Sequence, residues 1–185
     1  NENIYKNDVD IDEFKEIEKF TIVINQNYNL KRFKDHIDYN ELKKNNKDIL
    51  YSVKLLSNQK LMLFVSSGKV FSIDPNDIPG GNSNPKSFIY FVDSQQNDSV
   101  VGLLSSDYEK IFLASKNGKG FISNIKKLVT NQRKGKQLFN LKNNDSVIKV
   151  FSIKKSHLIC VSKLQKMLAF DIDTVPELQK GVGVQ

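Results

Sequence analysis

Four stretches of this chain resemble one another, and each predicts a β-hairpin. Each has an apolar strand, a tight polar turn, a second strand with a basic residue at or near its start, and a polar loop that ends in an aliphatic residue. The stretches are FTIVINQNYNLKRFKDHID (residues 20–38), LMLFVSSGKVFSIDPNDIP (61–79), KIFLASKNGKGFISNIKKLV (110–129) and HLICVSKLQKMLAFDIDTVPEL (157–178).

The spacing of these hairpins predicts a repeat fold. Positions Ile24, Val65, Ala114 and Val161 match and lie 41, 49 and 47 residues apart. A repeat of 40–50 residues with several short strands is typical of a propeller-like array, in which each blade packs against its neighbours. Two more strands are expected after each of the second and third hairpins, in KSFIYFVD (86–93), SVVGLLSSD (99–107), KQLFNLK (136–142) and SVIKVFSIK (146–154).

The predicted fold class is therefore all-β, with blades of four strands, three full blades and part of a fourth. Residues 19–185 form this domain, and residues 1–18 are interpreted as an acidic linker because they hold seven acids and two lysines. The fourth unit stops after its second strand, at KGVGVQ. We therefore expect a longer parent protein, or another segment, to complete that blade.

The charge balance indicates a polyanionic partner. The net charge is +7, and because residues 1–18 carry −5, the remainder carries +12. No basic amphipathic helix is visible, so nucleic acid is favoured over anionic lipid. A lysine-rich solvated surface is the alternative, since only two of the 28 basic residues are arginine. We expect no membrane span and no signal peptide, and hence a cytoplasmic protein.

Catalytic motifs are not recognisable in the sequence. His36 and His157 lie 121 residues apart with no cluster of ligands at metal-binding spacing, and Cys160 is the single cysteine. Walker, Rossmann and nucleophile-elbow patterns are missing. The acidic pairs Asp74/Asp77 and Asp171/Asp173 are predicted to make turn-type hydrogen bonds to backbone rather than acid–base chemistry.

Basic residues recur at matched places instead. Because blades rotate about an axis, a cation repeated in each blade forms a curved stripe that suits a bent duplex, and a glycine lets backbone approach a phosphate closely. A solvated lysine rim is the equally open alternative. The candidates come from the hairpins and from the polar loops GGNSNPK (80–86), NQRKGKQ (131–137) and QKGVGVQ (179–185). They are Lys31, Arg32, Lys34, Lys69, Lys119, Arg133, Lys134, Gly135, Lys136 and Lys166.

The quoted hairpins, with LASKNGKGFISNIKKLVTNQRKGKQLFNL and DTVPELQKGVGVQ, resemble in order the C-terminal domain of the A subunit of type IIA topoisomerases, the family of DNA gyrase and topoisomerase IV. The closer likeness is to the topoisomerase IV A subunit, over residues 19–185. The resemblance implies a β-pinwheel whose blades exchange strands. It also implies that the outer edge binds and bends duplex DNA and delivers it to a catalytic core. That core, with its DNA-cleaving tyrosine, lies N-terminal to this region, so no tyrosine here receives that role.

Gyrase carries a box of the form Gln-Arg-Arg-Gly-Gly-Arg-Gly in its first blade. Here Gln132 to Lys136 keeps Gln-basic-basic-Gly but lies in the third unit, and the first unit has NELKKNNKD without glycine. This departure favours topoisomerase IV. The C-terminal domain of the gyrase A subunit is the near alternative, and a protein-binding scaffold is the second.

The resemblance further implies partners and cofactors. The partners are duplex DNA, the catalytic core of the same polypeptide and the separate ATPase subunit, in the bacterial cytoplasm at the nucleoid. The parent enzyme uses ATP and Mg²⁺, whereas this domain is expected to need no cofactor or metal and to be no enzyme by itself.

Overall fold

The chain folds into successive antiparallel hairpins joined by short connections. The computed structural model describes residues 16–142, 144–153, 157–161 and 167–184, with the backbone alone for residues 157–161 and 167–170. The first unit contains β1 (Lys19–Asn25), β2 (Asn29–Lys34), α1 (Tyr39–Asn45) and β3 (Ile49–Leu56). The second contains β4 (Leu61–Val65), β5 (Lys69–Ile73), η2 (Pro75–Asp77), β6 (Lys86–Ser87), η3 (Phe88–Tyr90) and β7 (Val100–Ser105). The third contains β8 (Lys110–Ser115), β9 (Gly120–Asn124), η4 (Ile125–Leu128), β10 (Lys136–Gln137) and β11 (Val147–Ser152), and the fourth contains β12 (His157–Val161), β13 (Met167–Asp171) and η5 (Ile172–Thr174).

Each blade combines strands from two units. The strand orders are β3-β1-β2-β6 in the first blade, β10-β5-β4-β7 in the second and β11-β8-β9 in the third. The edge of the third blade is extended by Val184, which exchanges backbone hydrogen bonds of 2.8 and 3.0 Å with Gly120. The hairpin β12–β13 begins a fourth. The all-β pinwheel of three blades and part of a fourth is confirmed, and in the first two blades the following unit supplies an edge strand.

The third strand of each unit is shorter than predicted. In the expected strands 86–93 and 136–142, only Lys86–Ser87 and Lys136–Gln137 pair in a sheet. The apolar residues that follow leave the sheet to fill the core, where Phe88, Leu138 and Phe139 are buried. In the first unit this position holds α1, which the sequence did not predict because Leu42 is its one buried residue.

The core lies between the blades. All five residues of β4 are buried, because its two faces pack against different neighbours. Leu61, Leu63 and Val65 contact the core shared with β1 of the first blade. Met62 and Phe64 belong to the core shared with β8 and β9 of the third blade. The side-chain alternation of one strand therefore joins three blades.

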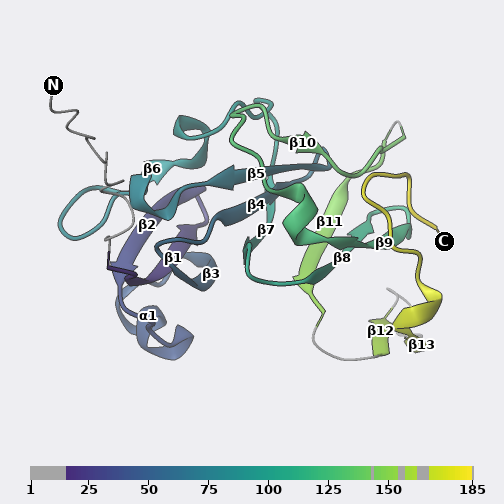
Figure 1. Cartoon of the computed structure of the whole chain (residues 1–185), viewed down its shortest axis with the longest axis horizontal. Coiled ribbons are helices and arrows are strands. Elements are labelled where there is room, and N and C mark those ends of the chain that lie inside the picture. The colour runs from purple at the N-terminus through teal and green to yellow at the C-terminus, as the bar shows by residue number, and fades with distance from the viewer. Residues whose placement is uncertain (1–15, 143, 154–156, 162–166, 185) are drawn as a thin grey trace, which may run out of the picture.

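The blades follow one another along the long axis of the molecule (Figure 1). The exchanged strands β6 and β10 lie along one edge, and α1 lies at the opposite edge. The edge with β6 and β10 carries the loops 80–87 and 130–137, in which several of the candidate cations occur.

Candidate nucleic-acid interface

The exchanged edge strands place two lysines at equivalent positions. Lys86 of β6 lies opposite Leu30 of β2, and Lys136 of β10 lies opposite Val70 of β5. Leu30 and Val70 are equivalent, since each is the first residue to pair after its hairpin turn. Lys136 was predicted as a site residue, whereas Lys86 was missed. Its signal was present in the sequence, because Lys86 ends the loop GGNSNPK.

The hairpin turns repeat a second basic position. Ile24 pairs with Leu30, Phe64 with Val70 and Ala114 with Gly120, so each connection has five residues. The structural match to Ile24 is therefore Phe64 and not Val65 as the sequence spacing indicated. When the hairpins are aligned by these pairs, the predicted cations Lys69 and Lys119 both occupy the last of the five connecting positions. Asn29 takes that position in the first hairpin, and the predicted Lys166 lies outside the described residues.

Both lysine-bearing turns are held by an aspartate. The carboxylate of Asp98 accepts a hydrogen bond from the backbone N–H of Ser67 at 3.0 Å, and that of Asp145 accepts one from Asn117 at 3.1 Å. Asp145 also accepts from Ser115 Oγ at 2.9 Å. Burial of Asp145 favours its neutral form and raises its pKa. The hydrogen bonds from Ser115, Asn117 and the N–H of Ser146, together with the charge of Lys119, outweigh this effect and lower the pKa. The repeated Asn-Asp-Ser-Val at 97–100 and 144–147 was the overlooked sequence signal.

The predicted cations of β2 do not form one stripe. Lys31 donates from Nζ to the carbonyl oxygen of Gly81 at 2.8 Å. The guanidinium of Arg32 lies over the ring of Phe20, 4.5 Å from its centroid, and lines a different pocket from Lys31. Lys34 shares the face of Arg32 and is exposed. Strand alternation thus directs Lys31 to one face of the sheet and the other two cations to the opposite face.

The loop before β10 is docked against the preceding unit. Arg133 donates from Nη2 to the carbonyl oxygen of Tyr90 at 2.9 Å, and its Nε lies 3.3 Å from the carboxylate of Asp93. The backbone N–H of Asp93 in turn donates to the Arg133 carbonyl oxygen at 2.9 Å. Arg133 is therefore both an exposed cation and a connection between two blades. Lys134, the next residue, is exposed.

Gly135 and Lys136 set the position of this loop. Gly135 has φ of +65°, and a Cβ there would lie 2.5 Å from the carbonyl oxygen of Val70. Only glycine permits this approach of the loop to β5. The amine of Lys136 donates to the carbonyl oxygens of Lys127 and Val129 at 3.0 Å each, so this predicted cation is partly engaged within the protein.

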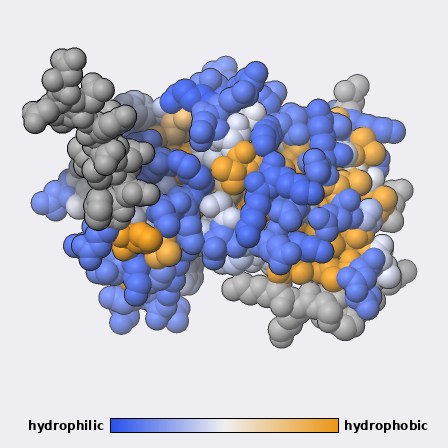
Figure 2. Space-filling view, viewed as in Figure 1, coloured by the Kyte–Doolittle hydropathy of each residue, from blue (hydrophilic) through white to orange (hydrophobic). Residues whose placement is uncertain are grey.

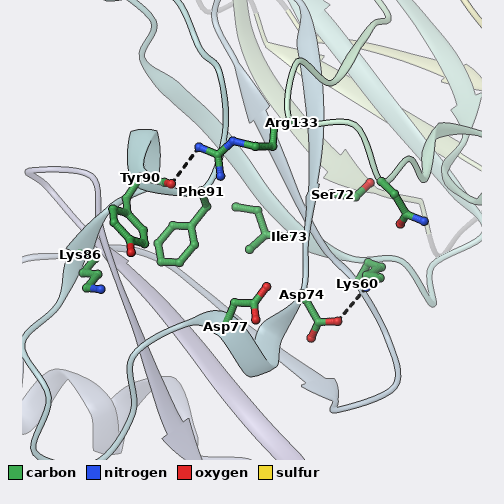
Figure 3. A pocket seen from close by; sticks show the side chains of 10 residues that line it. Lys60, Ser72, Ile73, Asp74, Asp77, Lys86, Tyr90, Phe91 and Arg133 are labelled. Atoms are coloured by element: carbon green, nitrogen blue, oxygen red, sulfur yellow. Dashed lines mark hydrogen bonds and ion pairs between the residues drawn. The ribbon is translucent and has the colours of Figure 1, made fainter. Parts of the chain in front are cut away.

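A pocket of about 570 Å³ lies between the first two blades and this loop. Figure 3 shows Arg133 and Tyr90 on one side, with Asp74 and Asp77 across from them. Lys60 Nζ lies 2.8 Å from the carboxylate of Asp74. Burial raises the pKa of Asp74, but the bonds from Lys60 and Asn76 outweigh it and the net pKa is lowered. The pocket therefore has charges of both signs. Lys86 and Arg133 come from β6 and the loop, whereas Lys60 lies across from them beside Asp74.

The first aspartate of each acidic pair caps a turn. The backbone N–H of Asn76 donates to Asp74 at 2.9 Å, and that of Asp173 donates to Asp171 at 3.4 Å, as predicted. Within the described ranges, no three His, Cys, Asp or Glu side chains gather as a metal site requires. The described part of the chain also contains no helix suited by length and hydropathy to cross a membrane. Figure 2 shows that hydrophilic residues cover most of the face in view, with apolar side chains in separate patches.

Known proteins share this sequence and architecture. A family model described as DNA gyrase C-terminal domain, beta-propeller, matches residues 109–154. The A subunit of DNA topoisomerase 4 from Rickettsia felis is 28% identical over 178 residues, which are 95% of this chain and 24% of that protein. The corresponding protein of Escherichia coli K12 is 30% identical over 135 residues, 71% of this chain and 18% of that protein. The chain thus spans about a quarter or less of the length of these relatives.

Solved structures extend the likeness to the fold. The E. coli ParC C-terminal domain superposes with a TM-score of 0.78 at 30% identity, covering 90% of this chain and 70% of that one. The C-terminal domain of a DNA topoisomerase IV gives a TM-score of 0.74 at 17% identity, covering 92% and 57% respectively, and supports the fold. The chain belongs to the family of topoisomerase IV A subunits and represents their C-terminal β-pinwheel domain, which is related to that of the DNA gyrase A subunit.

Proposed function

We propose that this domain binds duplex DNA with little sequence preference and bends it along the edge formed by β6, β10 and the adjoining turns. The observation that carries the proposal is the recurrence of cations in register from blade to blade. Lys86 and Lys136 are equivalent on the edge strands, and Lys69 and Lys119 are equivalent in the turns. Family membership supports DNA as the polyanion.

The mechanism is electrostatic. Lysine amines neutralise phosphates and release counterions, and this needs no base-specific geometry. Cations repeated on successive rotated blades contact a duplex at several points along a curve, so a bent duplex gains more contacts than a straight one. Lys34, Lys86 and Lys134 are exposed and suited to this role. Lys31, Arg32 and Arg133 are engaged with the protein and contribute positive potential together with their structural contacts.

The relatives support a wider role. The whole protein would be one component of a type IIA topoisomerase that passes DNA strands with ATP and Mg²⁺ in the bacterial cytoplasm, at the nucleoid. This domain would present a DNA segment to the catalytic core of the same polypeptide, which works with a separate ATPase subunit. We propose that the domain itself needs neither ATP nor Mg²⁺ to bind DNA.

Binding of the 185-residue chain to fluorescent duplexes of about 40 base pairs, measured by anisotropy at low salt, tests the proposal. Three duplexes of unrelated sequence should bind with affinities within a few-fold of one another, with EDTA present and without ATP. Undetectable binding to all three would overturn the proposal and favour a protein-binding scaffold.

A further inference from the structure

The turn η3 presents two apolar side chains outward beside the edge strand β6. The side chains of Ile89 and Tyr90 are 57% and 60% exposed, among the most exposed large apolar residues of the described chain. Phe88, at the start of the turn, is buried in the core, and Phe91 packs against that core. With three residues per turn, Phe88 and Phe91 face inward together while Ile89 and Tyr90 face solvent.

The turn η3 is packed against the core on its inward side. Phe88 packs edge-on against Tyr28 of the first hairpin, with ring centroids 5.9 Å apart at 89°. Phe91 contacts Tyr90 in a similar edge arrangement at 5.2 Å. Both inward rings thus anchor the turn to the core, and Ile89 and Tyr90 are exposed on its outer side.

Two cations flank the exposed tyrosine. The amine of Lys86 lies 4.2 Å from the centroid of the Tyr90 ring, and Arg133 donates to the Tyr90 carbonyl oxygen at 2.9 Å. Figure 3 shows Tyr90 between these side chains, with Lys86 and Arg133 on different sides of it. Exposed apolar side chains beside cations match the chemistry of a nucleic-acid groove, in which apolar sugar and base edges lie between two phosphate rows.

The equivalent segment of the next unit shows that this exposure is particular to η3. Because Lys136 is equivalent to Lys86, Leu138 and Phe139 are equivalent to Phe88 and Ile89. Leu138 and Phe139 are fully buried, and Phe139 packs on Phe121 with ring centroids 4.9 Å apart. The third unit therefore uses this segment for its core, whereas the second leaves Ile89 on the surface.

We propose that Ile89 and Tyr90 form an apolar wedge that enters the minor groove of the bound duplex while nearby cations hold its phosphates. The inference rests on the proposed function and adds the residues that localise the bend. Apolar side chains that enter between base steps partly unstack them and kink the duplex. Their contribution comes from removal of apolar surface from water and not from counterion release, so it does not depend on salt.

The test uses the 185-residue chain with Ile89→Ala/Tyr90→Ala, and Tyr39→Ala/Ile148→Ala as the matched control. Tyr39 and Ile148 are similarly exposed, at 45% and 54%, in α1 and β11. Anisotropy titrations at several salt concentrations give the affinity and salt slope, and energy transfer between duplex ends gives the bend. Circular dichroism melts check that each variant remains folded.

The wedge predicts that Ile89→Ala/Tyr90→Ala binds about tenfold more weakly at every salt concentration, with an unchanged salt slope and less end-to-end energy transfer. The control should match the wild type, and Tyr90→Phe should retain the bend. If wild type binds and bends DNA while Ile89→Ala/Tyr90→Ala behaves identically, the wedge is overturned and the proposed function stands. A lowered slope would also overturn it, since the variant would then act through Lys86. Failure of the wild type to bind would instead overturn the proposed function.

Discussion

Arg133 Nη2 donates a hydrogen bond of 2.9 Å to the carbonyl oxygen of Tyr90, which lies 43 residues earlier in the chain. The contact joins the loop before β10 to the turn after β6, so it connects the two segments that blades exchange. Arg133, which lies in the segment that resembles the gyrase box, therefore makes a structural contact and is also an exposed cation. Its neighbour Lys134 has the same charge and is exposed.

Arg133→Ala should destabilise the fold, whereas Lys134→Ala should not. Loss of the Tyr90 hydrogen bond and of the exposed pair with Asp93 should cost about 1 kcal/mol. This corresponds to a fall in Tm of about 2–4 °C. Lys134→Ala should change the free energy of unfolding by less than about 0.5 kcal/mol. Thermal melts followed by circular dichroism compare them, and equal Tm values would contradict the connecting role of Arg133.

Gly135→Ala should be the most damaging single change in the loop before β10. The new Cβ would meet the Val70 carbonyl oxygen at 2.5 Å, and φ is +65°. Strain and overpacking together should cost about 2–5 kcal/mol. Gly118→Ala is the matched control, because Gly118 has φ of +79° with no atom within 4 Å of the added Cβ.

The control isolates the backbone strain, which should cost about 1–2 kcal/mol. Urea unfolding curves give both free energies. If Gly135→Ala and Gly118→Ala lose the same stability, the close approach of this loop to β5 is not what requires glycine.

Asp145→Asn should remove part of the acid sensitivity of the fold. The pKa of Asp145 in the folded protein lies below its ordinary value of 3.8, so the ionised carboxylate stabilises the fold fully above that value. This stabilisation is lost as the pH falls through the lowered pKa. The difference in unfolding free energy between wild type and Asp145→Asn should therefore shrink between about pH 5 and pH 2.

Urea titrations at several pH values provide that difference. Ser115→Ala, which removes one of the donors to Asp145, should shift the profile in the same direction by a smaller amount. A difference that stays constant across this pH range would show that Asp145 does not hold the β8–β9 turn through its charge.

The hairpins were predictable because their signals are local. The apolar run of β4 and the turn glycines Gly68 and Gly118 each lie within a few residues of the strands they define. The bounds and register of the exchanged strands were not, because a two-residue strand such as Lys86–Ser87 has no pattern of its own and takes its register from β2, which belongs to another unit of the chain. The helix α1 buries Leu42 alone and so lacks the periodicity of an amphipathic helix.

The sequence predicted several of the cations of the candidate site, but not their contacts or the faces on which they lie. Equivalent lysines in the turns follow from the repeat, so Lys69 and Lys119 were identified from sequence. The partner of Arg133 is 40 residues away in sequence, and no local rule links it to Asp93. Lys31 and Arg32 are separated because successive residues of a strand alternate between faces. Which face each one occupies depends on the register between β2 and β1, which the sequence alone left unspecified.

The salt dependence of duplex binding tests the central claim most directly. The slope of log affinity against log salt should be negative, at about −0.9 for each phosphate neutralised. Lys86→Ala/Lys134→Ala should make the slope shallower by about 2 and weaken binding to all sequences alike. Lys43→Ala/Lys44→Ala, an equal loss of charge in α1 at the opposite edge, should leave the slope close to that of the wild type (Figure 1). An affinity independent of salt, or a slope unchanged in Lys86→Ala/Lys134→Ala, would contradict DNA binding by the edge that carries β6 and β10.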